Sequence, residues 1–133
     1  MLENFVKILA SFAMVLTMSV AASAQSVVPR NRTTDMGYVA NWEGGGGCNH
    51  LGKIKSSIRV KPKHGKAEFI WTYVKGANFP KHCIGKLKGL LLRYTPNPGF
   101  TGTDSFDIFY LTNRFTNDPA PKGHRETISV TVK

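Results

Sequence analysis

The sequence predicts an all-β protein in which about seven short strands form an antiparallel sandwich. Apolar residues recur with a period of two along several runs, the spacing of strands that bury one face. Clusters of glycine, proline and asparagine separate these runs, and no stretch has the spacing of an amphipathic helix. A single pair of cysteines adds a predicted disulfide.

Residues 1–24 are predicted to be a secretory signal peptide. Lys7 precedes an almost unbroken apolar run from Ile8 to Val20, and Ala22-Ser23-Ala24 has the small side chains of a cleavage site. A membrane anchor is the alternative, but a span needs roughly 20 apolar residues. We therefore expect an exported protein, secreted or periplasmic, that is cleaved after Ala24 and has no transmembrane segment after cleavage.

Cleavage of the 133-residue chain leaves 109 residues, enough for one domain with an ordinary core. The net charge of +10 passes whole to this domain, because Lys7 and Glu3 cancel within the signal peptide. Such a charge favours solubility and attraction to polyanions, but it does not determine the fold.

In chain order, residues 25–35 are expected to form an N-terminal arm or a first strand, and residues 36–133 the sandwich domain. Alternation marks the strands, and one face of each is apolar. The apolar faces are Met36, Tyr38, Ala40 and Trp42; Ile54, Ile58 and Val60; Ala67, Phe69, Trp71 and Tyr73; Leu90, Leu92 and Tyr94; Phe106, Ile108 and Tyr110. The chain ends in TISVTV, with β-branched residues on both faces.

The stretch YTPNPGFTGTDSF, from Tyr94 to Phe106, predicts a corner between two strands. Pro96 ends the first strand because proline has no N–H to donate, and Gly99 can take the positive φ of a turn. Phe100 is expected to fold back as a hydrophobic plug. Gly102 and Asp104 are expected in a second tight turn, where the carboxylate accepts backbone N–H groups, before Phe106 enters the core.

This corner, followed by the terminal TISVTV strand, resembles the bacterial Ig-like, cadherin-like repeat domains of surface and exported proteins. The segment PKHGK, Pro62 to Lys66, resembles the turn that often opens those domains. The resemblance covers residues 54–133 and implies a Greek-key sandwich that serves as a structural, adhesive or binding module, not as an enzyme. Some relatives bind calcium, but the carboxylates of this chain are scattered, so we expect no calcium site and no cofactor.

Cys48 and Cys83 are expected to form the disulfide, because an even cysteine count in an exported protein implies a bridge. Closing a loop of this length should stabilise the fold by about 3–4 kcal/mol. A catalytic or metal-binding thiol is the alternative.

The segment KIKSSIRVKPKHGK carries a row of cations with odd numbers, which would share one face of a continuous strand. These candidate polyanion-binding residues are Lys53, Lys55, Arg59, Lys61 and Lys63. Lys86, Lys88 and Arg93 would add to the row only if the fold placed them beside it. The alternative is a solvated face, or an edge strand that lysines protect from aggregation.

His50 and His82 flank the two cysteines, so a disulfide would bring both imidazoles into one neighbourhood. Two ligands are too few for a copper or zinc site, so these residues are weak metal candidates and no metal is expected. Trp71 is expected in the core and Trp42 nearer the surface. The sequence contains no nucleophile elbow, paired-carboxylate motif or cofactor fingerprint, so an enzyme is not expected.

These observations favour an exported binding or adhesion module that contacts an anionic polymer of the cell envelope, either acidic polysaccharide or lipid head groups, through the basic strand face. One alternative is a structural module that pairs its sheet edges with another exported protein. A less favoured one is a histidine-based copper or zinc binder. An exported protein rarely meets nucleic acid, so no specific nucleic-acid partner is expected, and the sequence does not predict the oligomeric state.

Overall fold

The computed structural model describes residues 25–43, 47–75 and 79–133. The predicted signal peptide lies outside the described residues, and so do residues 44–46 and 76–78, which belong to two of the glycine-containing clusters between the predicted strands. The signal peptide therefore stays a prediction.

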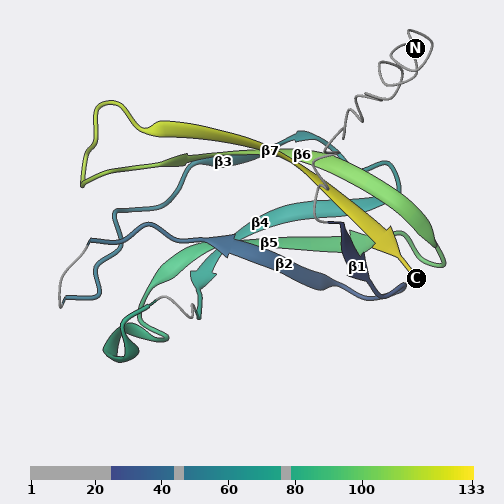
Figure 1. Cartoon of the computed structure of the whole chain (residues 1–133), viewed down its shortest axis with the longest axis horizontal. Helices are drawn as coiled ribbons and strands as arrows, with labels where there is room; N and C mark the ends of the chain where they lie inside the picture. The colour runs from purple at the N-terminus through teal and green to yellow at the C-terminus, as the bar shows by residue number, and fades with distance from the viewer. Residues whose placement is uncertain (1–24, 44–46, 76–78) are drawn as a thin grey trace, which may run out of the picture.

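Seven strands and one short 3-10 helix are present in the described part of the chain. They are β1 (Ser26–Val28), β2 (Thr34–Val39), β3 (Ser56–Val60), β4 (Gly65–Tyr73), η1 (Lys81–Cys83), β5 (Lys88–Pro96), β6 (Gly102–Thr112) and β7 (Lys122–Val132). One sheet has the order β1-β7-β6-β3 and the other β2-β5-β4. The sheets stack as two layers (Figure 1), which confirms the predicted all-β sandwich.

The strand order is that of an immunoglobulin-like sandwich, with β2, β4 and β5 in one layer and β3, β6 and β7 in the other. The chain crosses between layers from β1 to β2, from β2 to β3, from β3 to β4 and from β5 to β6. One pairing departs from the predicted antiparallel pattern. The short strand β1 pairs in parallel with the last three residues of β7, Val130 to Val132, near the C-terminus (Figure 1).

The main core lies between the layers and follows the predicted alternation. Leu92 and Tyr94 of β5 face Phe106 and Ile108 of β6, and Val28, Val130 and Val132 complete the buried cluster. Burying one such side chain stabilises the fold by about 1.5–3 kcal/mol. The predicted inner faces of β5 and β6 are thus confirmed where the strands pass through the centre of the sandwich.

A second, smaller core lies at one end of the sandwich, around the disulfide. Val74, Phe79, Cys83 and Leu87 are buried there, and Trp42 packs against them with its ring 4.8 Å from that of Phe79. The predicted disulfide between Cys48 and Cys83 is present, with a Cα–Cα distance of 5.3 Å. It fastens the loop before β3 to η1 and does not cross the main core.

The structure corrects the prediction that residues 53–63 form one continuous strand. β3 contains only Ser56–Val60, and its register with β6 shifts between Ile58 and Val60. Such a β-bulge sets two residues opposite one and breaks the alternation. Val60, expected beside Ile58 on the inner face, is therefore 51% exposed.

Two further expectations about aromatic residues need correction. β2 ends at Val39 and has a bulge between Asp35 and Gly37, so the predicted apolar face does not continue to Trp42 as one strand. After this bulge Tyr38 lies opposite Leu91 of β5, and it is 40% exposed. Trp71, expected in the core, is half-buried on β4, with its ring edge-to-face against His50 at 5.4 Å.

Candidate functional site

The predicted corner joins β5 to β6 across the two layers. The Asp104 carboxylate accepts four of the hydrogen bonds that hold it in place. This residue lies inside β6 and not in the second tight turn that the sequence predicted. Its carboxylate accepts hydrogen bonds from the backbone N–H groups of Lys63 (3.0 Å), His64 (3.1 Å) and Ser105 (2.9 Å). The Tyr94 hydroxyl donates a fourth bond, at 2.8 Å. Asp104, only 7% exposed, thus ties the turn between β3 and β4 to the corner.

Tyr94 is the buried partner of this carboxylate. Its side chain is fully enclosed, and its ring stacks on Phe106 with centroids 5.9 Å apart. Burial, together with the hydrogen bond to Asp104 and the charge of that carboxylate, raises the pKa of the Tyr94 phenol far above its ordinary value. The phenol therefore stays protonated and acts as a donor throughout the neutral range.

The turn PKHG approaches the corner so closely that its glycine is required. A Cβ on Gly65 would lie 2.6 Å from the backbone oxygen of Thr95 and 2.8 Å from the ring of Tyr94. The neighbouring His64 ring stacks on Phe100 with centroids 4.3 Å apart. Phe100 is the predicted plug, and it packs half-buried against the main core.

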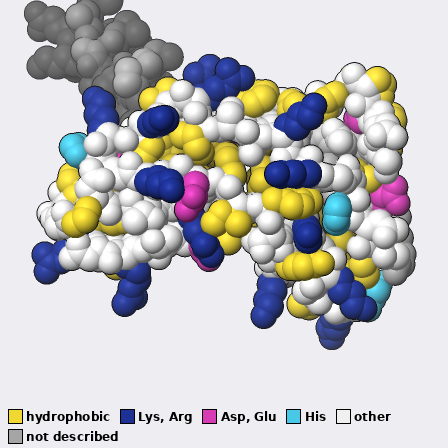
Figure 2. All heavy atoms as spheres, turned by 180° about the vertical axis from the view of Figure 1, so that it is seen from behind, with side chains coloured by type: hydrophobic (Ala, Val, Ile, Leu, Met, Phe, Trp, Pro, Cys, Tyr) yellow, Lys and Arg dark blue, Asp and Glu magenta, His cyan; other side chains and the backbone are white. Residues whose placement is uncertain are grey.

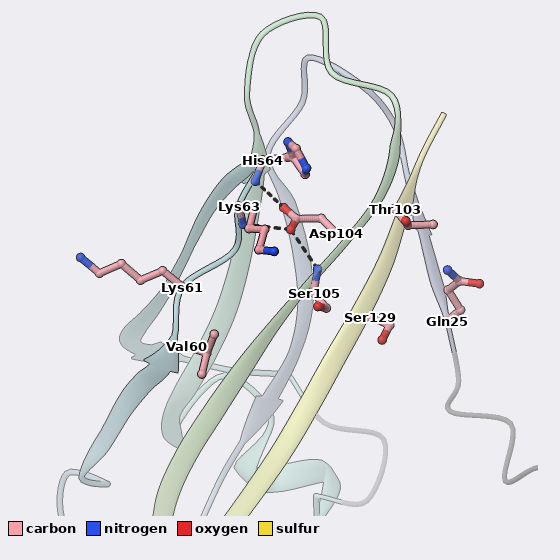
Figure 3. Close-up of a pocket in the computed structure, with 9 residues that line it drawn as sticks. All are labelled: Gln25, Val60, Lys61, Lys63, His64, Thr103, Asp104, Ser105 and Ser129. Carbon is pink, nitrogen blue, oxygen red and sulfur yellow. Dashed lines mark hydrogen bonds between the residues drawn. The ribbon is translucent and has the colours of Figure 1, made fainter.

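The end of the four-stranded sheet beside this corner is hollowed into a basin of about 450 Å³ on its outer face. Ser105 lies opposite Ser129 in the β6–β7 register, so two small hydroxyl side chains form the floor. The other lining residues are Gln25, Val60, Lys61, Lys63, His64, Thr103 and Asp104. Figure 3 shows the Lys63 side chain turned toward Asp104 and Ser105, whereas Lys61 extends away from them. We call this hollow the corner basin.

The predicted row of cations is divided by the structure. Lys53 and Lys55 precede β3, Arg59 lies at the bulge, and Lys61 and Lys63 follow β3 at the corner basin. Since β3 is the edge strand of its sheet, all five still follow one border of the sandwich. The Arg59 guanidinium lies 4.6 Å from the centre of the Phe109 ring on the outer face of that sheet.

In the described residues, no ion pair involves any of these five cations. The carboxylates of Glu68, Asp35, Asp118 and Asp107 pair instead with Lys66, Arg93, Arg114 and Arg125, respectively. Arg93, considered as a possible addition to the row, thus belongs to the opposite sheet and contacts Asp35 at 2.7 Å. Figure 2 shows lysine and arginine side chains spread over one face of the molecule with few acidic side chains among them.

The histidines flanking the cysteines have separate surroundings. The atoms of Cys48, His82 and Cys83 that could bind a metal lie within 4.8 Å of one another, but the two sulfurs are joined in the disulfide. That group therefore offers one imidazole as a metal ligand. His50 packs on Trp71, and its Nδ1 accepts a hydrogen bond from the Gly52 N–H at 3.3 Å.

Serine, histidine and aspartate meet at the corner basin, but their contacts are those of a structural clamp. Asp104 accepts the backbone N–H of His64, while the imidazole ring stacks on Phe100. In a catalytic triad, the carboxylate would instead accept from the imidazole ring and orient it as a base.

The hydroxyl floor is the part of the site that sequence reasoning missed. Thr103, Ser105 and Ser129 line the basin and alternate with inward-facing residues, and this spacing marks them as outward-facing. Their meeting depends on the β6–β7 register, which the alternation of each strand does not specify.

Comparisons with protein-family models, with curated proteins and with solved structures give no match to this chain. None of the helical segments in residues 25–43, 47–75 and 79–133 has the length and apolar character needed to span a bilayer.

Proposed function

We propose that this protein is an exported, non-enzymatic binding module that holds an acidic polysaccharide on the basic border formed by β3 and the corner basin. The observation that carries the proposal is the row of five cations, none of which forms an ion pair within the described part of the chain, and which ends at a basin floored by hydroxyl groups. Ammonium groups attract the carboxylates or sulfates of such a polymer, and serine and threonine hydroxyls can hydrogen-bond its sugar hydroxyls.

Two further features support this function. The disulfide is consistent with an oxidising compartment, where envelope and extracellular polysaccharides are found. The resemblance of the corner to cadherin-like repeat domains favours adhesion or binding over catalysis. A shallow basin suits a chain of linked sugars lying across the sheet better than a small substrate that must be enclosed.

The test is binding of polygalacturonate by the protein lacking residues 1–24, measured by calorimetry at several salt concentrations. We expect a dissociation constant that rises steeply with salt, because bound cations displace counterions from the polymer. The triple variant Lys55→Glu, Lys61→Glu, Lys63→Glu should bind at least about tenfold more weakly and show a shallower salt dependence.

A matched control separates the site from the net charge. The variant Lys75→Glu, Lys81→Glu, Lys86→Glu makes the same change in charge at exposed lysines outside the row. If both variants lost the same affinity for polygalacturonate, binding would depend on net charge alone, and the proposal would be contradicted. Binding to anionic phospholipid vesicles that exceeds binding to polygalacturonate would assign the row to lipid head groups instead.

A further inference from the structure

The outer edge of β7 is only partly covered. β1 pairs with Val130 to Val132, and residues 122–129 pair with β6 alone within the described chain. The Lys133 N–H donates to the Val28 oxygen, and the Lys133 oxygen accepts from the Arg30 N–H, so the backbone groups of Lys133 face outward. Since backbone direction alternates along a strand, those of Gly123, Arg125, Thr127 and Ser129 face outward too.

An apolar slot opens between the two sheets beside this free edge. A cavity of about 280 Å³ is lined by Phe69, Leu90, Leu92, Ile108 and Ile128, among others. A second hollow of about 330 Å³ shares Tyr38, Val39 and Tyr110 with the first and adds Trp42 and Phe79. β2 forms the opposite lip, and among the strands that the structure describes it pairs with β5 alone.

We propose that this slot binds an extended, acidic peptide segment of another protein, which adds a strand to the free edge of β7. Unpaired backbone groups at a sheet edge select an extended main chain, and alternate apolar side chains of that segment would fill the slot. Residues 122–129 offer about 26 Å of edge at the rise of a strand. The proposal does not depend on the polysaccharide site, which lies on the border formed by β3.

The structure already contains the pairing that this segment would continue. β1 binds the same edge of β7 in parallel, and an added strand would occupy the adjoining positions of the same ladder. Its apolar residues would point between the sheets, where Ile128 lies. Its remaining side chains would lie on the outer face, beside the Arg125 side chain, which is 67% exposed.

The charge of the chain favours an acidic partner over a second copy of the chain at the edge of β7. Lys122 and Arg125 lie along this edge, with Glu126 beside them in the lining of the slot, where its carboxylate accepts a hydrogen bond from the Tyr110 hydroxyl at 3.2 Å. Arg125 pairs with Asp107 at 3.7 Å, and the chain as a whole carries a net charge of +10. Two copies that each carry this net charge would repel one another, whereas an acidic segment would be attracted to the chain.

The experiment uses a synthetic peptide of about nine residues in which valine alternates with glutamate and threonine, added to the protein lacking residues 1–24. Amide hydrogen exchange read by NMR should show protection rising at least about tenfold at Gly123, Arg125, Thr127 and Ser129. The intervening amides already bond to β6 and should change little. Protection confined to other surfaces would overturn the proposal.

The matched variants are Thr127→Pro and Thr127→Ala. Proline removes one outward N–H without breaking a bond to β6, and strands tolerate it at such edge positions. Thr127→Pro should lower the affinity for the peptide at least about tenfold. Thr127→Ala loses the 2.7 Å hydrogen bond to Asp107 but keeps the N–H, and it should bind within about twofold of the native protein.

Equal affinity of the native protein and Thr127→Pro would show that the main-chain edge is not used. A version of the peptide with lysine in place of glutamate should bind more weakly, and equal binding would contradict the acidic preference. Protection of the four outward amides without peptide, rising with protein concentration, would assign the edge to a second copy and overturn the proposal.

Discussion

At position 104, a carboxylate sits almost out of contact with water and receives four hydrogen bonds from two separate parts of the chain. An anionic acceptor suits this place because all four of its partners are donors. An amide in the same position would turn an NH₂ group toward one or more of those donors.

The substitution Asp104→Asn should therefore destabilise the fold by about 2–4 kcal/mol, through buried donors left without an acceptor. Urea unfolding at pH 7 measures the change. Asp107→Asn is the control, because Asp107 lies on the outer face of the same strand and should cost less than about 1 kcal/mol. Similar losses for both variants would contradict the clamp role of Asp104.

Tyr94, which donates to the Asp104 carboxylate, makes the stability of the fold depend on pH in the alkaline range. In the unfolded chain the phenol ionises near pH 10, whereas its raised pKa in the folded protein keeps the proton bound. Above pH 10 the unfolded state thus binds fewer protons than the folded state, so stability falls as pH rises.

Replacing Tyr94 with phenylalanine removes this dependence along with one hydrogen bond. The native protein should be more stable than Tyr94→Phe by about 1–2 kcal/mol at pH 8. That advantage should shrink by about 1 kcal/mol at pH 11, because only the native chain has this phenol to ionise on unfolding. Urea unfolding of both proteins at the two pH values measures the difference in their free energies of unfolding. A difference that stays constant would contradict the link between Tyr94 ionisation and stability.

Among the elements, β3 is the one whose local geometry decides what the surface presents. Its bulge turns Val60 outward and lets Arg59 lie over Phe109. An edge strand with a bulge and flanking lysines is also protected against pairing with other chains. The same cations can bind a polyanion and also protect the edge strand from aggregation, since that protection requires only that their side chains are solvated.

The disulfide acts on the loops at one end of the sandwich and not on its centre. Cys48→Ser combined with Cys83→Ser should lower the free energy of unfolding by about 3–4 kcal/mol, the chain-entropy value for a loop of this size. Amide exchange should rise around Val74, Phe79 and Leu87, the smaller core, and stay slow at Tyr94 and Phe106. Uniform loosening of both cores would show that they are one cooperative unit.

For the molecule as a whole, the net charge of +10 opposes folding through mutual repulsion of the cations. The native protein should therefore gain thermal stability as salt rises from about 10 to 150 mM, because the Debye length shortens from about 30 to 8 Å. The triple variant at Lys55, Lys61 and Lys63 should show a smaller gain. Thermal scans by circular dichroism measure both, and a fall in the native melting temperature with salt would contradict this reading.

Much of the fold could be predicted because it depends on local chemistry. The alternation of Leu90, Leu92 and Tyr94 specifies a strand with one buried face, and the proline and glycine residues that follow specify where it must turn. The candidate site could be predicted only in part. The cations were visible in the sequence, but the hydroxyl floor depends on Ser105 meeting Ser129 across two strands.

The sequence by itself determined which residues of β5 and β6 face inward, where the chain turns after Tyr94 and that two cysteines would join, since period, backbone restrictions and cysteine count are local or countable. Only the tertiary structure decided that Asp104 binds a turn some 40 residues away, that β3 has a bulge, and that β1 pairs with the last three residues of β7. The physical reason is register. Shifting a strand by one residue exchanges its two faces, and contacts across the sandwich fix that choice.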